Sequence, residues 1–389
     1  MIKISALLLS TFLIFQTSYS QGIEFFHGEW KEALAEAKKQ DKLLFVDAYA
    51  QWCGPCKKMA KNVFTQAQVG EYFNSNFVNL KLDMETADGR KFGSKYPVSA
   101  YPTLLFLNGD GEIVKKVTGG QQADGLIGIG KNAIKSYDKS GDYAVLYEKG
   151  DRSFDLMMNY VTELNKVGKP SLKISNDYIN SKPEISATQK AQFLMTAVTE
   201  SDSRLFDMLL EHKSQAENAS SPDAFRAKVE SAIMATVSKA VEYDYPDMIT
   251  EALGKYKKVG IGDSKKFEQE AHLEYHKLAG NYSDWKKLAE KYIKKYGKKD
   301  HSVLKQQIAT LKSDFSYEKD AKPYACDVCK ELVKKDDNAA NYSEYIQLLM
   351  DCRKYDEARK VTNEAIKAAE KRNEDTKKFN RIIEYLDTI

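Results

Sequence analysis

Two cysteines separated by two residues, Cys53 and Cys56, stand where a strand pattern gives way to a helix pattern. Residues 43–48 (LLFVDA) form a short apolar run, typical of a strand that is covered on both faces. Pro55 favours the first turn of a helix, where the N–H group that proline lacks would have no partner. Cys53 therefore falls at a helix N-terminus, where free N–H groups and the helix dipole stabilise a thiolate.

This spacing lets the two sulfurs close a small disulfide ring and predicts different roles for them. Cys53 is expected to be the exposed nucleophile that attacks a substrate disulfide. Cys56, one turn into the helix and buried, is expected to resolve the mixed disulfide. A structural zinc site would need a second pair of ligands nearby, and this part of the chain offers only His27. A purely structural disulfide is the third use of such a pair, although closing so short a loop stabilises little.

The pattern of apolar residues over the first domain, residues 21–138, predicts a mixed sheet with helices on both faces. Strands are expected over residues 43–48, 77–83, 103–107 and 113–118, and helices over 29–39, 66–74 and 124–137 as well as from Pro55. The last two strands flank Asn108-Gly109-Asp110-Gly111, a strong hairpin signal. Helical crossovers join the first two strands, a further helix is expected between the second and third strands, and a hairpin joins the last two. These elements complete the predicted α/β fold.

The segment VDAYAQWCGPCK, residues 46–57, resembles the active-site strand and loop of the thioredoxin-like family. Tyr101-Pro102-Thr103, before an apolar strand, resembles the cis-proline segment of that family. The first domain is also similar to the soluble C-terminal domain of membrane electron transporters of the DsbD type. The resemblance implies a thioredoxin fold and a redox-active disulfide between Cys53 and Cys56, with neither a cofactor nor a metal.

The resemblance also implies an acid beneath the active site. Asp47 matches a buried carboxyl group that would assist proton removal from Cys56; the alternative is a partly solvated carboxylate at a strand end. The lysine that the family places near this acid aligns with Asn79. Lys81, two positions on, points to the same face of a strand, and whether it compensates is left open.

A substrate surface follows from the same resemblance. Pro102 is expected in the cis form, facing the disulfide and presenting the backbone of Tyr101 to an extended substrate; a trans turn proline is the alternative. Trp52 would shelter the sulfurs and offer a flat apolar contact, unless it only packs in the core. Gly54 and Pro55 complete the expected surface. Tyr101 replaces the isoleucine that is common in the family, which would alter substrate preference.

The N-terminus has the pattern of a secretory signal peptide. Lys3 precedes an apolar stretch over residues 4–15 that is too short to span a bilayer comfortably. Ser18 and Ser20 are small residues at the two positions that signal peptidase recognises, so residues 1–20 are expected to be removed. An uncleaved membrane anchor is the alternative. Export, most simply to a bacterial periplasm, is the predicted destination.

The rest of the chain has a different character. After a short polar stretch at residues 139–142, residues 143–389 show helical periodicity and predict an all-α region. Tyr282, Tyr317 and Tyr355 lie in weakly similar segments at spacings of 35 and 38 residues, near the period of tetratricopeptide repeats. We interpret the region as degenerate helix pairs, an arrangement that commonly offers a concave face to partners.

Three further cysteines lie in this helical region. Cys326 and Cys329 form a second pair with the same spacing, but neither a tryptophan before it nor a Gly-Pro within it supports redox chemistry. An interhelical disulfide with Cys352 and simple packing of free thiols are the other interpretations. His272 and His276 stand one helical turn apart without a third ligand in the pattern, so we interpret them as surface or core residues.

Charge excludes one class of partner. The sequence holds 59 Lys and Arg against 56 Asp and Glu, a formal net charge of +3, whereas a nucleic-acid binder needs a clear basic surplus. The predicted function is an extracytoplasmic thiol–disulfide oxidoreductase of the reductase or isomerase type, acting on protein disulfides. A reductase outside the cytoplasm would take electrons from a membrane donor of the DsbD kind. A helical scaffold or a chaperone that uses the fold for binding is the alternative.

Overall fold

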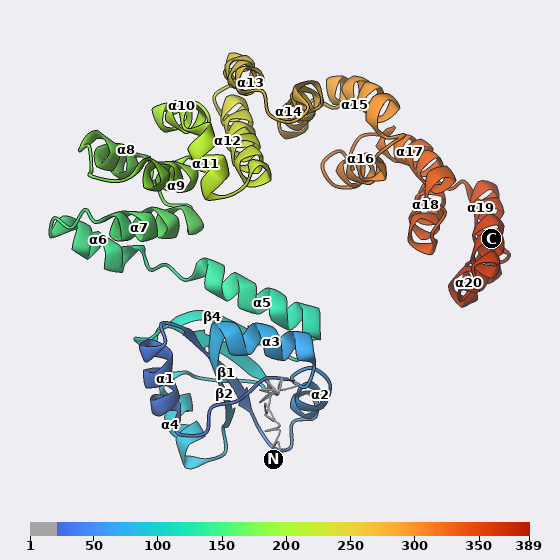
Figure 1. Cartoon of the computed structure of the whole chain (residues 1–389). Coiled ribbons are helices and arrows are strands. Elements are labelled where there is room, and N and C mark those ends of the chain that lie inside the picture. The colour runs from blue at the N-terminus through green and yellow to red at the C-terminus, as the bar shows by residue number, and fades with distance from the viewer. Residues whose placement is uncertain (1–21) are drawn as a thin grey trace, which may run out of the picture. The chain divides into compact units, whose positions relative to one another are not determined.

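The computed structural model describes residues 22–389, and the predicted signal peptide lies outside them (Figure 1). The chain divides into two compact units: the first ends at Ser171, and the second runs over Leu172–Ile389. Among the described residues, the first holds a four-stranded sheet and the second consists of helices. The predicted fold class, a mixed sheet with flanking helices followed by an all-α region, is confirmed.

The sheet of the first unit has the strand order β2-β1-β3-β4. β1 pairs in parallel with β2 and antiparallel with β3, and β3 pairs antiparallel with β4. The register places Asp47 beside Lys81 on one side and beside Leu104 on the other. The strands are β1 (Leu43–Tyr49), β2 (Phe77–Asp83), β3 (Thr103–Leu107) and β4 (Ile113–Thr118).

Helices cover both faces of this sheet. The helices around the sheet are α1 (Trp30–Lys39), α2 (Gly54–Asn62), α3 (Ala67–Asn76), α4 (Ala87–Lys95) and α5 (Ala123–Ser136). One face packs against α1 and α4, and the other against α2, α3 and α5 (Figure 1). The order of strands and helices is the one expected from the sequence.

β1 is one of the two central strands of the sheet, and its side chains are buried on both faces. Leu44 and Val46 belong to the core cluster that α1 and α4 cover, and Phe45 to the opposite one. The ring centre of Phe45 lies 4.8 Å from that of Phe73, in an edge-on arrangement, and 5.1 Å from that of Phe106, in a tilted one. Aromatic pairs prefer such arrangements. The strand is therefore held firmly up to the point where the cysteine loop begins.

The predicted hairpin joins β3 to β4. The side-chain Oδ1 of Asn108 accepts hydrogen bonds from the backbone N–H groups of Asp110, at 3.1 Å, and of Glu112, at 2.8 Å. Gly111 takes a left-handed conformation with φ of 79°, which costs glycine little because it has no Cβ. A Cβ there would also lie 2.8 Å from the hydroxyl oxygen of Tyr96, so the turn requires glycine on two grounds.

Two helices follow α5 within the first unit: α6 (Ser140–Glu148) and α7 (Phe154–Lys166). The stretch 139–142, predicted as a polar link, contains the first turn of α6. Asp138 explains this difference, because its carboxylate accepts a hydrogen bond from the backbone N–H of Ser140 at 2.8 Å and pairs with Lys169 at 2.5 Å. These contacts hold the pKa of Asp138 down, at about 2.

The second unit consists of helices that mostly pack against their neighbours in sequence. Contacts join α16 to α17, α17 to α18, α18 to α19 and α19 to α20. A core cluster extends from Leu273 to Leu386 through these helices. The helices are α8 (Leu172–Asn180), α9 (Ala187–Ala197), α10 (Arg204–Glu211), α11 (Lys213–Ala219), α12 (Pro222–Glu242), α13 (Asp247–Val259), α14 (Ser264–Leu278), α15 (Tyr282–Tyr296), α16 (His301–Ser313), α17 (Ala321–Lys335), α18 (Ala339–Asp351), α19 (Tyr355–Lys371) and α20 (Lys377–Leu386).

Each helix in residues 22–389 is too short or too polar to cross a membrane.

Candidate active site

Cys53 and Cys56 form a disulfide at the start of α2, with Cα atoms 5.3 Å apart. Cys53 is the N-cap of the helix: its backbone is extended, and its sulfur accepts a hydrogen bond from the backbone N–H of Cys56 at 3.1 Å. Pro55 lies in the first turn, as expected. The sulfur of Cys53 thus sits where unpaired N–H groups and the positive end of the helix dipole favour a thiolate.

The predicted exposure of Cys53 is wrong for the oxidised protein. Cys53 and Cys56 are each only 3% exposed. They pack with Ala50, and the rings of Tyr49 and Tyr101 lie against the cluster. The physical reason is that Tyr49, the last residue of β1, and Tyr101, which precedes the cis-proline, pack against the two cysteines and cover them.

The Tyr101-Pro102 peptide bond is cis, as the sequence predicted. Antiparallel pairing places Thr103, the first residue of β3, beside Ala48 near the end of β1. Pro102 and the cysteine loop therefore lie at the same end of the two central strands. The carbonyl of Pro102 accepts a hydrogen bond from the N–H of Gly119 at 2.8 Å, which ties this segment to the end of β4.

Trp52 is the most exposed large apolar side chain of this site, with 68% of its surface accessible. Core packing, the alternative interpretation, is thereby excluded. The indole N–H donates a hydrogen bond to Glu85 at 2.9 Å, and the ring lies edge-on to Tyr101 at 5.8 Å. Glu85 was not among the residues predicted from the sequence, because its partner lies 33 positions away and no motif contains it.

Asp47 lies on β1 with only 1% of its surface exposed, so it is not a partly solvated carboxylate. Neither of its side-chain oxygens accepts a hydrogen bond from residues 22–389. Burial raises its pKa from 3.8 to about 7, and the positive charge of Lys81 opposes part of this rise. Near neutral pH the group can therefore both take up and release a proton, as a general base requires.

Asn79 and Lys81 have different surroundings in the structure. The side-chain amide of Asn79 donates hydrogen bonds to the carbonyl of Glu24 at 3.3 Å and to Asn74 at 3.2 Å, so it has a structural role. The ammonium of Lys81 lies 4.7 Å from the ring centre of Tyr49, on the strand beside Asp47. Lys81 is thus the cation whose charge reaches the buried acid.

After reduction of the disulfide, Cys53 is expected to react with an alkylating agent before Cys56 at mildly acidic pH. The helix N-terminus stabilises the Cys53 thiolate, whereas Cys56 lies inside the helix. The measurement is limited alkylation followed by tandem mass spectrometry of the peptide that carries both cysteines. Preferential labelling of Cys56 would reverse the assigned roles.

The second Cys-x-x-Cys sequence has a different environment. Cys326 and Cys329 are buried free thiols in α17, and Cys352 is a half-buried free thiol at the end of α18. The sulfur of Cys326 lies 3.7 Å from that of Cys352. The structure therefore contains all three as free thiols. Cys326 contacts Cys352, its partner in the interhelical disulfide that was considered from the sequence.

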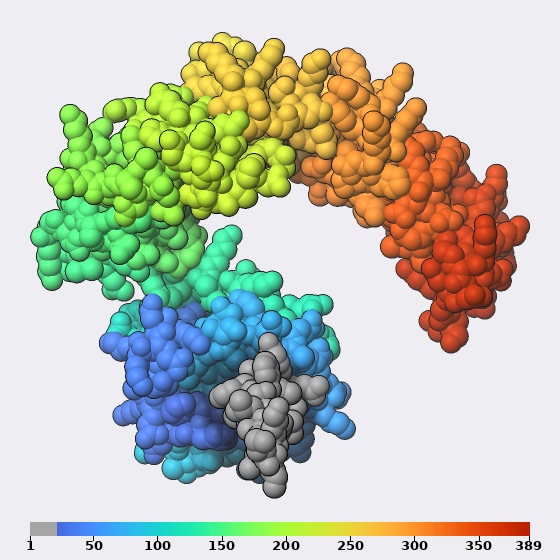
Figure 2. All heavy atoms as spheres, in the orientation of Figure 1, coloured from blue at the N-terminus to red at the C-terminus, as the bar shows by residue number. Residues whose placement is uncertain are grey.

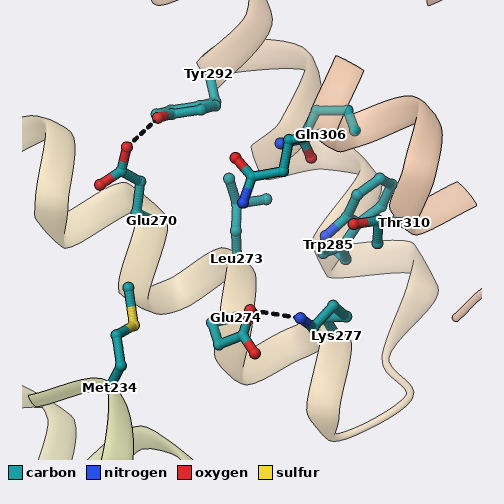
Figure 3. A pocket seen from close by; sticks show the side chains of 10 residues that line it. Met234, Glu270, Leu273, Glu274, Lys277, Trp285, Tyr292, Gln306 and Thr310 are labelled. Atoms are coloured by element: carbon teal, nitrogen blue, oxygen red, sulfur yellow. Dashed lines mark hydrogen bonds and ion pairs between the residues drawn. The ribbon is translucent and has the colours of Figure 1, made fainter. Parts of the chain in front are cut away.

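The helical unit also contains a polar cavity of about 270 Å³ between α12, α14, α15 and α16 (Figure 3). On its wall Glu270 accepts a hydrogen bond from the hydroxyl of Tyr292, and Glu274 pairs with Lys277 at 2.6 Å. Gln307 lines the same cavity, is 3% exposed, and its carbonyl oxygen has no hydrogen-bond partner among the described residues. The cavity therefore offers a ligand an unused acceptor.

The paired histidines His272 and His276 line a surface hollow on α14 and α15 that also contains four lysines. Burial lowers the pKa of His276. Residues 22–389 contain no group of three or more His, Cys, Asp or Glu side chains placed to hold a metal ion.

Comparison with known proteins places the similarity in the first unit. Residues 26–109 match the family model described as thioredoxin-like. A thioredoxin from Echinococcus granulosus is 40% identical over 79 residues, which cover 20% of this chain and 68% of that protein. The thiol:disulfide interchange protein DsbD of Pseudomonas fluorescens is 38% identical over 84 residues, or 21% of this chain and only 14% of that protein.

Among solved structures, a candidate disulphide-isomerase from Bacteroides thetaiotaomicron is 47% identical. The match covers 30% of this chain and 98% of that one, with a TM-score of 0.28.

Proposed function

This chain belongs to the thioredoxin-like family, and from that premise we propose that it is an extracytoplasmic thiol–disulfide oxidoreductase, a reductase or isomerase of protein disulfides. The observation that carries the proposal is the Cys53–Cys56 disulfide with the sulfur of Cys53 as the N-cap of α2. The nearby cis-Pro102 and the exposed Trp52 support a surface for an extended substrate.

The reaction follows from the order of the two thiols. The reduced enzyme attacks a substrate disulfide with the Cys53 thiolate, which forms a mixed disulfide and releases one substrate sulfur as a thiolate. Cys56 then loses its proton and attacks the sulfur of Cys53, which releases the second substrate thiolate and leaves the Cys53–Cys56 disulfide. Two electrons pass to the substrate in each cycle.

Asp47 is proposed to accept the Cys56 proton in the second step. Its burial and its pKa of about 7 make the carboxylate a base of suitable strength near neutral pH. Lys81 acts through Asp47 as a positioning residue, because its charge favours the ionised form of that carboxyl. Cys53, Cys56, Asp47 and Pro102 are the proposed catalytic set, and Trp52, Gly54, Pro55 and Tyr101 the proposed substrate contacts.

The direction of the reaction is proposed from the residues between the cysteines. Gly54 and Pro55 are similar to those of reductive relatives. The predicted signal peptide supports a location outside the cytoplasm, where a membrane donor of the DsbD kind would supply electrons. An isomerase would rearrange a scrambled substrate without net electron input, whereas a reductase would consume two electrons for each disulfide it opens. Assay of a scrambled protein with and without an added reductant separates these two activities.

The main test is capture of substrates by the Cys56→Ala variant in the native host. Without Cys56 the mixed disulfide on Cys53 cannot be resolved by the normal route, so substrate proteins should remain bound until a reductant is added. The matched control carries Cys53→Ser in addition and should capture none. If both variants retain the same reductant-sensitive proteins, the proposed nucleophile is wrong.

The second candidate function is a helical interaction scaffold, which is supported by the array of helices in the second unit that pack against their neighbours in sequence. A scaffold would bind its partner equally well with Cys53→Ser and would show no turnover of a model disulfide. A chaperone would bind unfolded chains whatever the state of its thiols. Partner binding measured with oxidised, reduced and Cys53→Ser protein separates the oxidoreductase from the other two functions, and binding of a generic unfolded chain separates the chaperone from the scaffold.

The proposed domain organisation is a thioredoxin-like domain at residues 21–138 followed by a helical domain at residues 143–389. The location of the hydrophobic core supports this division. Both core clusters of the sheet draw their members from residues before α6. A fragment of residues 21–139 is therefore expected to fold cooperatively and to reduce a small disulfide at nearly the full-length rate. Thermal unfolding and turnover of a small aromatic disulfide are the measurements.

The matched control for this fragment is residues 21–171, which keeps α6, α7 and the pair between Asp138 and Lys169. Equal activity of both fragments is the expected result. A folded but inactive shorter fragment beside an active longer one would place part of the active site beyond residue 139 and would contradict the proposed boundary.

A further inference from the structure

We propose that Cys326 and Cys352 form a second disulfide, which links α17 to the end of α18 when the protein meets a disulfide oxidant. The two sulfurs already lie 3.7 Å apart. A disulfide needs them at about 2.05 Å, so closure requires a small approach that side-chain rotation can provide. This dithiol lies in a different unit from Cys53 and Cys56, so its oxidation does not depend on the proposed function.

The surroundings of the pair explain why these two sulfurs are partners and Cys329 is not. Cys326 lies near the start of α17, which packs directly against α18, and Cys352 is the C-cap of α18. Cys329 is completely buried in the core cluster of the helical unit, with 0% of its surface exposed. Bonding within the Cys326-x-x-Cys329 sequence would leave the adjacent Cys352 unused.

Solvent accessibility determines which of the two thiols reacts first with an oxidant. Cys352 is the only one of the three thiols in this unit that is not fully buried, so an oxidant reaches it first. Burial and the contact with Cys352 raise the pKa of Cys326, and the cation of Lys354 opposes that rise. The buried Cys326 thiol is therefore the resolving group and not the one that meets the oxidant.

The chemistry balances with glutathione disulfide as the oxidant. The Cys352 thiol loses its proton, attacks one sulfur of glutathione disulfide and releases a glutathione thiolate, which takes up the proton. The Cys326 thiol then loses its proton and attacks the sulfur of Cys352, and the second glutathione thiolate leaves and is protonated. Two protein thiols are oxidised to one disulfide, and one glutathione disulfide is reduced to two glutathione molecules.

The test uses the full chain carrying Cys53→Ser and Cys56→Ser, so that glutathione disulfide is the only oxidant present. The protein is fully reduced, freed of reductant, exposed to glutathione disulfide, alkylated and digested without reduction. Cleavage by trypsin together with a protease that cuts before aspartate separates Cys326 from Cys329, because Asp327 lies between them. Mass spectrometry then identifies the linked peptides.

The expected result is a peptide pair joined through Cys326 and Cys352, with Cys329 alkylated only after denaturation. A link between Cys326 and Cys329, a link between Cys329 and Cys352, or glutathione retained on Cys352 without closure would each overturn the proposal. A second measurement follows the helical unit by circular dichroism. Oxidation should raise its unfolding midpoint by about 5–10 °C, because the bond closes a loop around α18. A rise that persists in a Cys352→Ser variant would contradict the assignment.

Discussion

Replacement of Cys53 with serine is expected to lower the rate of disulfide reduction by about 10³-fold or more. A serine hydroxyl has a far higher pKa than a thiol, so the anion that the start of α2 stabilises in the wild type would hardly form at neutral pH. The measurement is reduction of insulin with dithiothreitol as the electron source, corrected for the uncatalysed rate. The change should alter stability little, because serine is an effective N-cap in its own right.

The matched control is Cys352→Ser, which removes a thiol from the helical unit and leaves the proposed active site intact. It should retain the full rate of insulin reduction. Comparable losses in the two variants would mean that turnover does not depend on the N-cap of α2, and a fully active Cys53→Ser variant would refute the proposed nucleophile outright.

The Asp47→Asn variant is expected to become more stable than the wild type as the pH rises. In the wild type, burial raises the pKa of Asp47 from 3.8 to about 7, so the folded state binds the proton more tightly than the unfolded state. Between these two values the folded state holds more protons, and stability falls with rising pH. At pH values above 7 the loss amounts to about 4 kcal/mol, because each pKa unit corresponds to about 1.4 kcal/mol.

The difference in unfolding free energy between Asp47→Asn and wild type should thus grow by about 4 kcal/mol from pH 4 to pH 8.5. Urea unfolding followed by the fluorescence of Trp30 and Trp52 measures it, with Trp285→Phe in both proteins to remove the signal of the helical unit. A difference that does not change with pH would show that Asp47 is not titrating in the folded state.

The same substitution should slow resolution of the mixed disulfide, because the proposed proton acceptor for Cys56 is lost. A decrease of about 10²-fold is expected, the lower end of what general base catalysis contributes. Rapid-quench measurements of the decay of the mixed disulfide on Cys53 isolate this step. If the decay rate is unchanged while stability rises as expected, burial of Asp47 destabilises the folded protein and Asp47 has no catalytic role.

The fold of the first unit could be predicted because local signals agreed with one another. The apolar run of β1, the proline at the start of α2 and the Asn-Gly-Asp-Gly turn each specify one element, and the structure has all three. The disulfide and the cis peptide at Pro102 followed from a motif shared with a well-known family. Short-range patterns and shared motifs were sufficient for these features.

Features that depend on packing between distant segments were not predictable from the sequence. The burial of Cys53 depends on Tyr49, the last residue of β1, and on Tyr101, which precedes β3 and lies about 50 positions further along the chain. The bond from Trp52 to Glu85 and the charge of Lys81 near Asp47 likewise need the register of β1 and β2. Spacing along the chain does not contain that information.

The separate cores of the two units have a practical consequence. The core clusters on both faces of the sheet consist of side chains that precede α6, whereas the cluster from Leu273 to Leu386 lies wholly in the helical unit. If turnover needs only the sheet unit, a catalytic assay is silent about more than half of the chain, residues 172–389. A preparation that is proteolysed or unfolded in that half would still pass such an assay as fully active, so quality control of this protein requires a probe located beyond residue 171.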